Sequence, residues 1–156
     1  MSGASEIPQI GRVAGIDYGT VRIGVAITDR QRRIASPLDN YQRQSEPADA
    51  DYFRDLATSH EVALFVVGLP VHLSGRESEK SREAKDFAEW LGRVVEIPVV
   101  LFDERFTSVE AERHLIASGL SKKKRKQRLD KLAAQIMLSA YLDTSADYDS
   151  AAPLDD

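Results

Sequence analysis

The sequence predicts an α/β fold, in which helices flank a five-stranded mixed sheet. Short turns join the first three predicted strands, which is typical of antiparallel pairing, whereas helical segments separate the later strands and favour parallel pairing. The chain has 156 residues, of which 42% are hydrophobic, and this suits one soluble domain with a full core. We expect a flexible leader over residues 1–10, a single domain over residues 11–144, and an acidic, disordered tail over residues 145–156.

The first part of the chain predicts three consecutive strands. Residues 12–18 and 22–28 are rich in β-branched and small apolar residues, and the turn at Gly19 and Thr20 joins them into a hairpin. Residues 33–41 have a weaker strand pattern. They contain Pro37, which indicates a strand at the edge of the sheet.

The middle of the chain alternates helices with strands. Ser45, followed by Pro47, indicates the start of a helix that runs to about residue 59. The continuous apolar run of residues 62–67 indicates a central strand that is covered on both faces. A long amphipathic helix follows Gly75, and a short apolar strand follows it at residues 98–102.

Two further helices complete the predicted order. The sequence Thr107-Ser108-Val109-Glu110 has the form of a capping box, so we expect a helix from residue 107 to about residue 119. Apolar residues recur with helical spacing from residue 129 onward, after a run of basic residues, and predict a last helix.

Three acidic residues occupy positions where folding alone does not favour a charge. Asp17 lies inside the first strand, Glu104 follows the fifth strand, and Asp130 lies in the first turn of the last helix. Ionised acids are rarely buried unless they are paired or bind a metal, and ligands gather beyond the carboxyl ends of parallel strands. We therefore expect these three side chains to form a cluster that Mg²⁺ or Mn²⁺ stabilises.

Two of these acids, Asp130 and Glu104, also have a structural interpretation, whereas the cost of burying a charge argues against one for Asp17. Asp130 suits a helix N-terminus, and Glu104 suits an ion pair with Arg105. Asp103 is either a fourth ligand or the group that orients Arg105.

A two-metal site of this composition would hydrolyse phosphodiester bonds. Two divalent ions can activate a water molecule and stabilise the leaving 3′ oxygen at the same time. Asp17 would bridge the ions, and Glu104 and Asp130 would each hold one of them.

A dense basic run precedes the last apolar repeat, in a chain whose net charge is −4. We expect this run to contact a nucleic-acid backbone with a steep salt dependence, although a solvated loop is the alternative. His72, in the loop after the fourth strand, is a second candidate contact or a solvent-exposed histidine. We expect Trp90 to pack in the core or between helices rather than to stack on a base. The basic run comprises Lys122, Lys123, Lys124, Arg125, Lys126 and Arg128.

Four motifs, in this order and spacing, resemble the YqgF family over residues 11–142. They are GIDYGTVRIGVAITD at residues 15–29, VVGLP at 66–70, DERFTS at 103–108 and LDKLAAQIML at 129–138. Members of that family are RNase H-like proteins described as Holliday-junction resolvases and as pre-16S rRNA nucleases. The resemblance implies an RNase H-like fold and a cytoplasmic endonuclease for structured nucleic acid. It assigns the acidic positions to Asp17, Glu104 and Asp130, with supporting positions at Gly19, Thr20, Arg22, Gly68, Pro70 and Arg105.

Two other functional classes compete with a nuclease. A non-catalytic nucleic-acid or ribosome-associated module would have no use for clustered acids near phosphates. A phosphate-binding ATPase of the actin, heat-shock chaperone or sugar-kinase type has a similar turn to Asp17-Tyr18-Gly19-Thr20, but needs two such domains.

The composition excludes one kind of metal site and a membrane span. The chain has no cysteine, which excludes thiolate metal sites, and no apolar run long enough to span a membrane. A homodimer is expected if the substrate is a junction that is cut symmetrically. The choice between precursor rRNA and branched DNA stays open.

Overall fold

The computed structural model describes residues 7–70, 78–104, 119 and 121–151, and the side chains of residues 125–131 and 145–151 lie outside its described part. The predicted helix at residues 107–119 and the predicted loop contact His72 also lie outside it. The elements are, in chain order, β1 (Arg12–Asp17), β2 (Arg22–Thr28), β3 (Ala35–Gln42), α1 (Glu46–Ser59), β4 (Val62–Leu69), α2 (Glu79–Val95), β5 (Val99–Asp103) and α4 (Lys122–Ala151).

The strands form one five-stranded sheet in the order β3-β2-β1-β4-β5. Strands β1, β2 and β3 pair antiparallel, whereas β4 pairs parallel to β1 and β5 pairs parallel to β4. The predicted mixed sheet is therefore confirmed, with β1 at its centre. Pro37 lies on the edge strand β3, beside a register shift in its pairing with β2, where a missing N–H is tolerated.

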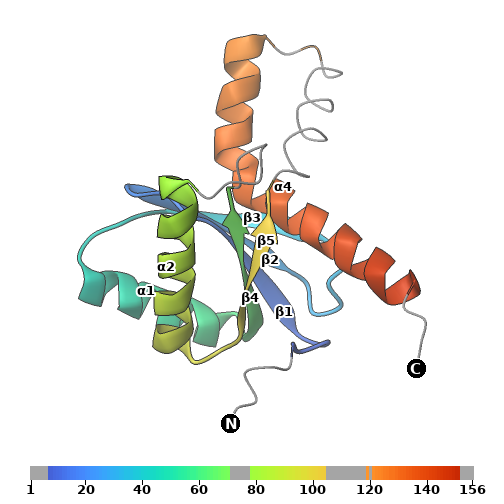
Figure 1. Cartoon of the computed structure of the whole chain (residues 1–156), viewed down its shortest axis with the longest axis horizontal. Coiled ribbons are helices and arrows are strands. Elements are labelled where there is room, and N and C mark those ends of the chain that lie inside the picture. Colours follow the sequence, from blue (N-terminus) through green and yellow to red (C-terminus); the bar gives the residue numbers. More distant parts are fainter. Residues whose placement is uncertain (1–6, 71–77, 105–118, 120, 152–156) are drawn as a thin grey trace.

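Helices cover both faces of the sheet (Figure 1). Helices α1 and α2 lie on one face, where Ile16, Phe53 and Phe65 belong to the same buried cluster. Helix α4 lies on the other face, where Val13 and Leu138 belong to a second cluster. Because side chains alternate along a strand, Asp17 has the same orientation as Val13, toward the α4 side.

The centre of the sheet allows α4 to approach closely. A Cβ atom at Gly15 would lie 2.9 Å from the Cβ atom of Leu138, so any larger residue there would push the helix outward. A Cβ atom at Gly24 would lie 3.5 Å from the Cβ atoms of both Ala134 and Asp17. Ala134 of α4 therefore lies beside the end of β1 that carries Asp17.

Local signals fix the starts of α1 and α2. The Ser45 hydroxyl accepts a hydrogen bond from the Ala48 N–H (3.2 Å), and the Ser78 hydroxyl accepts one from the Ser81 N–H (3.1 Å). Trp90 packs edge-on against Phe53, and its indole N–H donates to a Glu46 oxygen at 3.1 Å. This confirms the prediction that Trp90 packs between the helices.

The last helix is longer than the sequence pattern predicts. It begins at Lys122, so the basic run is helical and Asp130 lies in the third turn rather than the first. Lysine, arginine and glutamine are good helix formers, which explains why the helix extends through the charges. The helix also continues past residue 145, where we expected an irregular tail, to Ala151.

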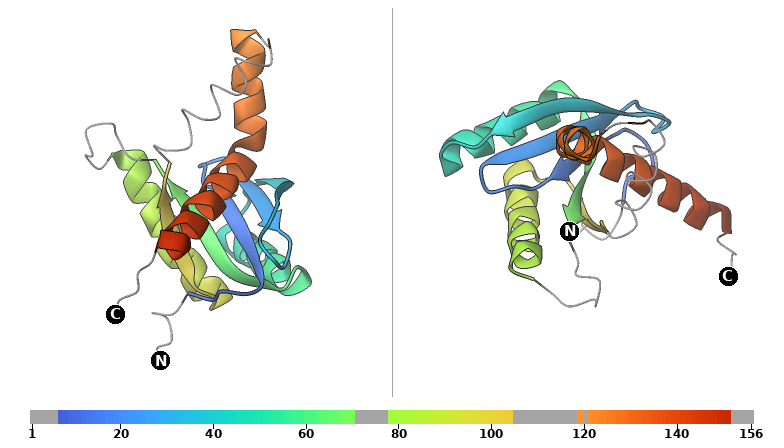
Figure 2. Two further views of the ribbon diagram at one scale, coloured as in Figure 1. Left: turned by 90° about the vertical axis from the view of Figure 1, so that its right-hand side faces the viewer. Right: turned by 90° about the horizontal axis from the view of Figure 1, so that it is seen from above.

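Only one half of α4 lies against the sheet (Figures 1 and 2). The C-terminal part crosses the sheet, whereas the N-terminal part projects beyond the carboxyl ends of β4 and β5 (Figures 1 and 2). We call residues 122–128 the basic arm. Across the described ranges, no helix combines the length and the apolar character that a membrane span requires.

Candidate active site

Two of the three predicted acids lie at the carboxyl edge of the sheet. Asp17 is the last residue of β1, and Glu104 directly follows β5, where its N–H donates to the Leu69 oxygen of β4 at 3.0 Å. Strands β1, β4 and β5 are parallel neighbours, so their carboxyl ends meet at one edge. The sheet thus brings together two acids that are far apart in the sequence.

Gly68 provides the space into which Glu104 folds. A Cβ atom at Gly68 would overlap the Glu104 carboxylate, with the carboxyl carbon only 2.8 Å away. Gly68 follows Leu64 and Val66 in the alternation along β4, and both of those residues face α4. The Glu104 carboxylate therefore lies over β4 on the same face of the sheet as Asp17.

A cavity of about 380 Å³ connects the two acids with the predicted supporting residues. The turn between β1 and β2 and the first turns of α2 form the rest of its wall, with Lys80 and Glu83 from α2. Its lining includes Asp17 and Glu104 together with Gly19, Thr20, Arg22, Gly68 and Pro70.

The site makes ionisation of Glu104 unfavourable. Burial raises the pKa of Glu104 to about 7, and the negative charge of Asp17 adds to this effect. The positive charge of Lys80 opposes the rise in pKa, and Asp103 contributes a smaller rise. A carboxylate that is held near another one in partial burial is stabilised by a cation, so this pair fits a hard divalent ion.

The third predicted ligand is located only by its backbone. Asp130 belongs to α4, four residues before Ala134, which lies beside Asp17. Among the side chains that the structure describes, no group of three acids or histidines could hold a metal ion, and Asp130 is not among those side chains. Asp103 does not complete such a group with Asp17 and Glu104.

The residues predicted to contact nucleic acid lie at the N-terminal end of α4. Lys122, Lys123 and Lys124 are exposed in its first turn. Arg125, Lys126 and Arg128 continue the same helix, and their side chains lie outside the described part. Arg105 lies outside the described residues.

The sequence analysis missed the contribution of α2. Lys80 lines the cavity, and its charge acts on Glu104, yet the chain separates these two residues widely. The available signal was Ser78, because a helix cap shortly after a parallel strand puts the first helical turn at the carboxyl edge.

Comparisons with known proteins agree with this architecture. A profile of the RuvX Holliday junction resolvase family matches residues 11–144. A protein of Rhodopirellula baltica that carries the provisional name pre-16S rRNA nuclease is 48% identical over 87% of this chain and 79% of its own length. A similarly named protein of Koribacter versatilis is 41% identical over 85% of this chain and 87% of its own.

Solved structures support the fold. RuvC of Thermus thermophilus superposes with a TM-score of 0.51 at 14% identity, over 86% of this chain and 96% of that one. RuvC of T. thermophilus in complex with a Holliday junction substrate gives a TM-score of 0.50 at 15% identity, over 86% of this chain and 97% of that one. The fold is therefore RNase H-like, as in these resolvases. On the strength of the profile and of the identity to its relatives, the chain belongs to the RuvX Holliday junction resolvase family.

Proposed function

We propose that this protein is an endonuclease that depends on Mg²⁺ or Mn²⁺ and hydrolyses phosphodiester bonds in structured nucleic acid. Family membership supports a nuclease that acts on nucleic acid. The observation that carries the proposal is that Asp17 and Glu104 line one cavity at the carboxyl edge of the sheet, where burial, reinforced by the charge of Asp17, raises the pKa of Glu104 to about 7.

Asp17, Glu104 and Asp130 would hold the divalent ions. The position of Ala134 beside Asp17 supports a role for Asp130, because residues four apart in a helix lie one turn apart on the same face. When bound, the ions supply a nucleophilic water and stabilise the leaving oxygen. The strand ends hold the two acids, and the cavity admits the substrate.

The basic arm would bind the phosphate backbone beside this cavity. It projects past the strand ends that carry the two acids, so it extends the site along a nucleic-acid strand (Figure 1). Backbone contacts of this kind give affinity without sequence information.

We propose precursor 16S rRNA as the first substrate and a four-way DNA junction as the second. The names of the relatives support the former, and the family description supports the latter. Symmetric cutting of a junction would require two protomers with one active site each. The cytoplasm is the compartment where either substrate would be met.

The test offers both substrates to the purified protein, with metal and with chelator. We expect cleavage of at least one substrate with Mg²⁺ or Mn²⁺, no cleavage with chelator, and none by Asp17→Asn although it still binds. Full activity of Asp17→Asn, or equal cleavage with chelator, would contradict the proposal. Binding without cleavage by the wild type would favour the non-catalytic module instead.

A further inference from the structure

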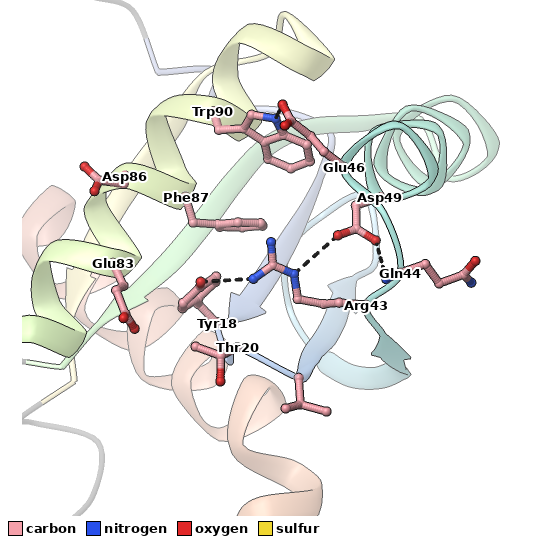
Figure 3. Close-up of a pocket in the computed structure, with 11 residues that line it drawn as sticks. Tyr18, Thr20, Arg43, Gln44, Glu46, Asp49, Glu83, Asp86, Phe87 and Trp90 are labelled. Carbon is pink, nitrogen blue, oxygen red and sulfur yellow. Dashed lines mark hydrogen bonds and ion pairs between the residues drawn. The ribbon is translucent and has the colours of Figure 1, made fainter.

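A second cavity, shown in Figure 3, shares part of its lining with the cavity of the candidate active site. It has a volume of about 650 Å³ and lies between the β1–β2 turn, α1 and α2. Tyr18, Thr20, Val21 and Glu83 line this cavity as well as the one that contains Asp17 and Glu104. This shared wall would allow a nucleic-acid strand with one phosphate at the two acids to extend toward the second cavity.

Arg43 is held rigidly in the wall of this cavity. Its Nε donates to the buried Asp49 carboxylate at 3.3 Å, and its Nη1 donates to the Tyr18 hydroxyl at 3.0 Å. The Tyr41 hydroxyl and the Gln44 N–H also donate to Asp49, at 2.6 and 2.9 Å. The guanidinium carbon lies 5.3 Å from the centre of the Tyr18 ring. Arg43 is thus oriented before any ligand arrives.

Within the described residues, one nitrogen of Arg43, Nη2, has both of its N–H donors left for a ligand. Figure 3 shows this third nitrogen pointing toward the Phe87 and Trp90 rings, which line the cavity. Within the described part of the chain, this nitrogen makes no hydrogen bond. A ligand that accepts a hydrogen bond would satisfy it.

The other charges in the lining are negative. Glu46, Glu83 and Asp86 line the cavity in addition to the Arg43–Asp49 ion pair. Three carboxylates oppose the entry of an anion, so a phosphate is a poor ligand here. The Arg43 guanidinium is already paired with Asp49, so a ligand must offer an acceptor to Arg43 and N–H donors to the carboxylates. A neutral group with both acceptors and N–H donors matches the lining best.

We propose that this cavity binds an unpaired purine base from the nucleotide next to the cleaved phosphodiester bond. A purine offers N7, with O6 in guanine, as acceptors for the arginine donor, and an amino group as donor to the carboxylates. The rings of Tyr18 and Trp90 provide apolar surface for the base. The neighbouring position of the base rests on the proposed nuclease function, whereas base binding itself does not.

The chain contains a built-in reporter for this test. Its one tryptophan is Trp90, in the wall of the cavity, so a single indole N–H resonance reports on occupancy. We would titrate the full chain with guanosine, adenosine, uridine and ribose, in the presence of chelator. Purine nucleosides should shift this resonance saturably and more strongly than uridine, and ribose should leave it unchanged.

A matched pair of variants locates the binding. Asp86→Asn removes a carboxylate from the cavity, and Glu89→Gln removes one from the same helix outside it. Because a hydrogen bond to a charged group is lost, Asp86→Asn should weaken purine binding about tenfold, whereas Glu89→Gln should not. No saturable shift with any purine, an equal shift with ribose, or equal effects of the two variants would overturn the proposal.

An oligonucleotide experiment then tests the position of the base. Abasic substitution at the nucleotide that flanks the cut should weaken binding about tenfold, and Asp86→Asn should abolish that difference. If the wild-type protein cleaved neither substrate, the nuclease proposal would fail. The nucleoside titration would still test whether the cavity binds a purine base. If every flanking abasic site were tolerated, the base site would be disproved although the nuclease stood.

Discussion

The site makes Glu104 harder to ionise than a free glutamate. Burial and the charge of Asp17 raise its pKa to about 7, and a metal ion binds the ionised form. Below pH 7, metal binding must therefore displace a proton. We expect the apparent Mn²⁺ affinity to fall about tenfold for each pH unit below 7. Mn²⁺ titrations between about pH 5.5 and 7.5 measure this, and an affinity that stays constant over that range would contradict it.

The same shift predicts a change in folding stability without metal. The pKa of Glu104 is raised from 4.5 to about 7, so its ionisation is harder in the folded than in the unfolded chain. The stability that neutral Glu104 contributes is complete below about pH 4.5 and is lost as the pH rises through 7. Thermal unfolding in chelator should show that the stability of the wild type, relative to Glu104→Gln, decreases as the pH rises from about 4.5 to 7. A difference that is independent of pH would disprove it.

Gly68 is the residue that leaves room for the Glu104 carboxylate. Gly68→Ala would force the carboxylate away from the edge of the sheet, so we expect cleavage to fall at least about tenfold. Gly92→Ala is the matched control, because Gly92 lies in α2 outside the cavity lining. A Cβ atom there would lie at an ordinary contact distance of 3.7 Å from Val99. That control should retain activity. Equal activity of the two variants would show that Gly68 has no such role.

Some residue-level features could be inferred from the sequence and others could not. A charge inside an apolar strand singled out Asp17, and a position just past the end of the fifth predicted strand singled out Glu104. No local signal related Lys80 to Glu104, or Arg43 to Tyr18, because these pairs meet only after the sheet and helices have packed. The role of Asp130 stays a prediction.

Helix α4 is the element that combines two tasks, since it covers the sheet and extends into the basic arm. We expect the triple change of Lys122, Lys123 and Lys124 to Gln to weaken nucleic-acid binding. Each lost phosphate contact lowers the salt slope by about 1. Affinity measured over a range of salt concentrations tests this, with exposed Arg33, Arg54 and Arg93 changed to Gln as the control. Equal losses in both triple variants would indicate only a net-charge effect.

The elements were predictable where short-range patterns define them. Strand β2 and helix α1 have the predicted bounds, because alternation, the Ser45 cap and Pro47 are all local signals. The start of α4 was predicted wrongly. A dense run of like charges suggests a solvated loop, but the intrinsic helix preference of lysine and arginine prevails.

At the scale of the whole molecule, the sheet order creates the site. Strand β1 has an antiparallel partner on one side and a parallel partner on the other, and β5 lies one strand further on. This order puts Asp17 and Glu104 at one edge, with Gly68 between them on β4. The sequence predicted the mixed sheet from its connections, but the closeness of the two carboxylates depends on how Glu104 folds over Gly68.

If Asp17, Glu104 and Asp130 hold divalent ions together, as proposed, removing a carboxylate from this set must weaken Mn²⁺ binding. Calorimetric titration would compare the wild type with Asp17→Asn, Asp130→Asn and Asp143→Asn, the last being an exposed acid on the same helix as Asp130. We predict that Asp17→Asn and Asp130→Asn each weaken Mn²⁺ binding at least about tenfold, while Asp143→Asn binds like the wild type. Wild-type Mn²⁺ affinity in Asp130→Asn would show that Asp130 does not hold the ions with Asp17 and Glu104.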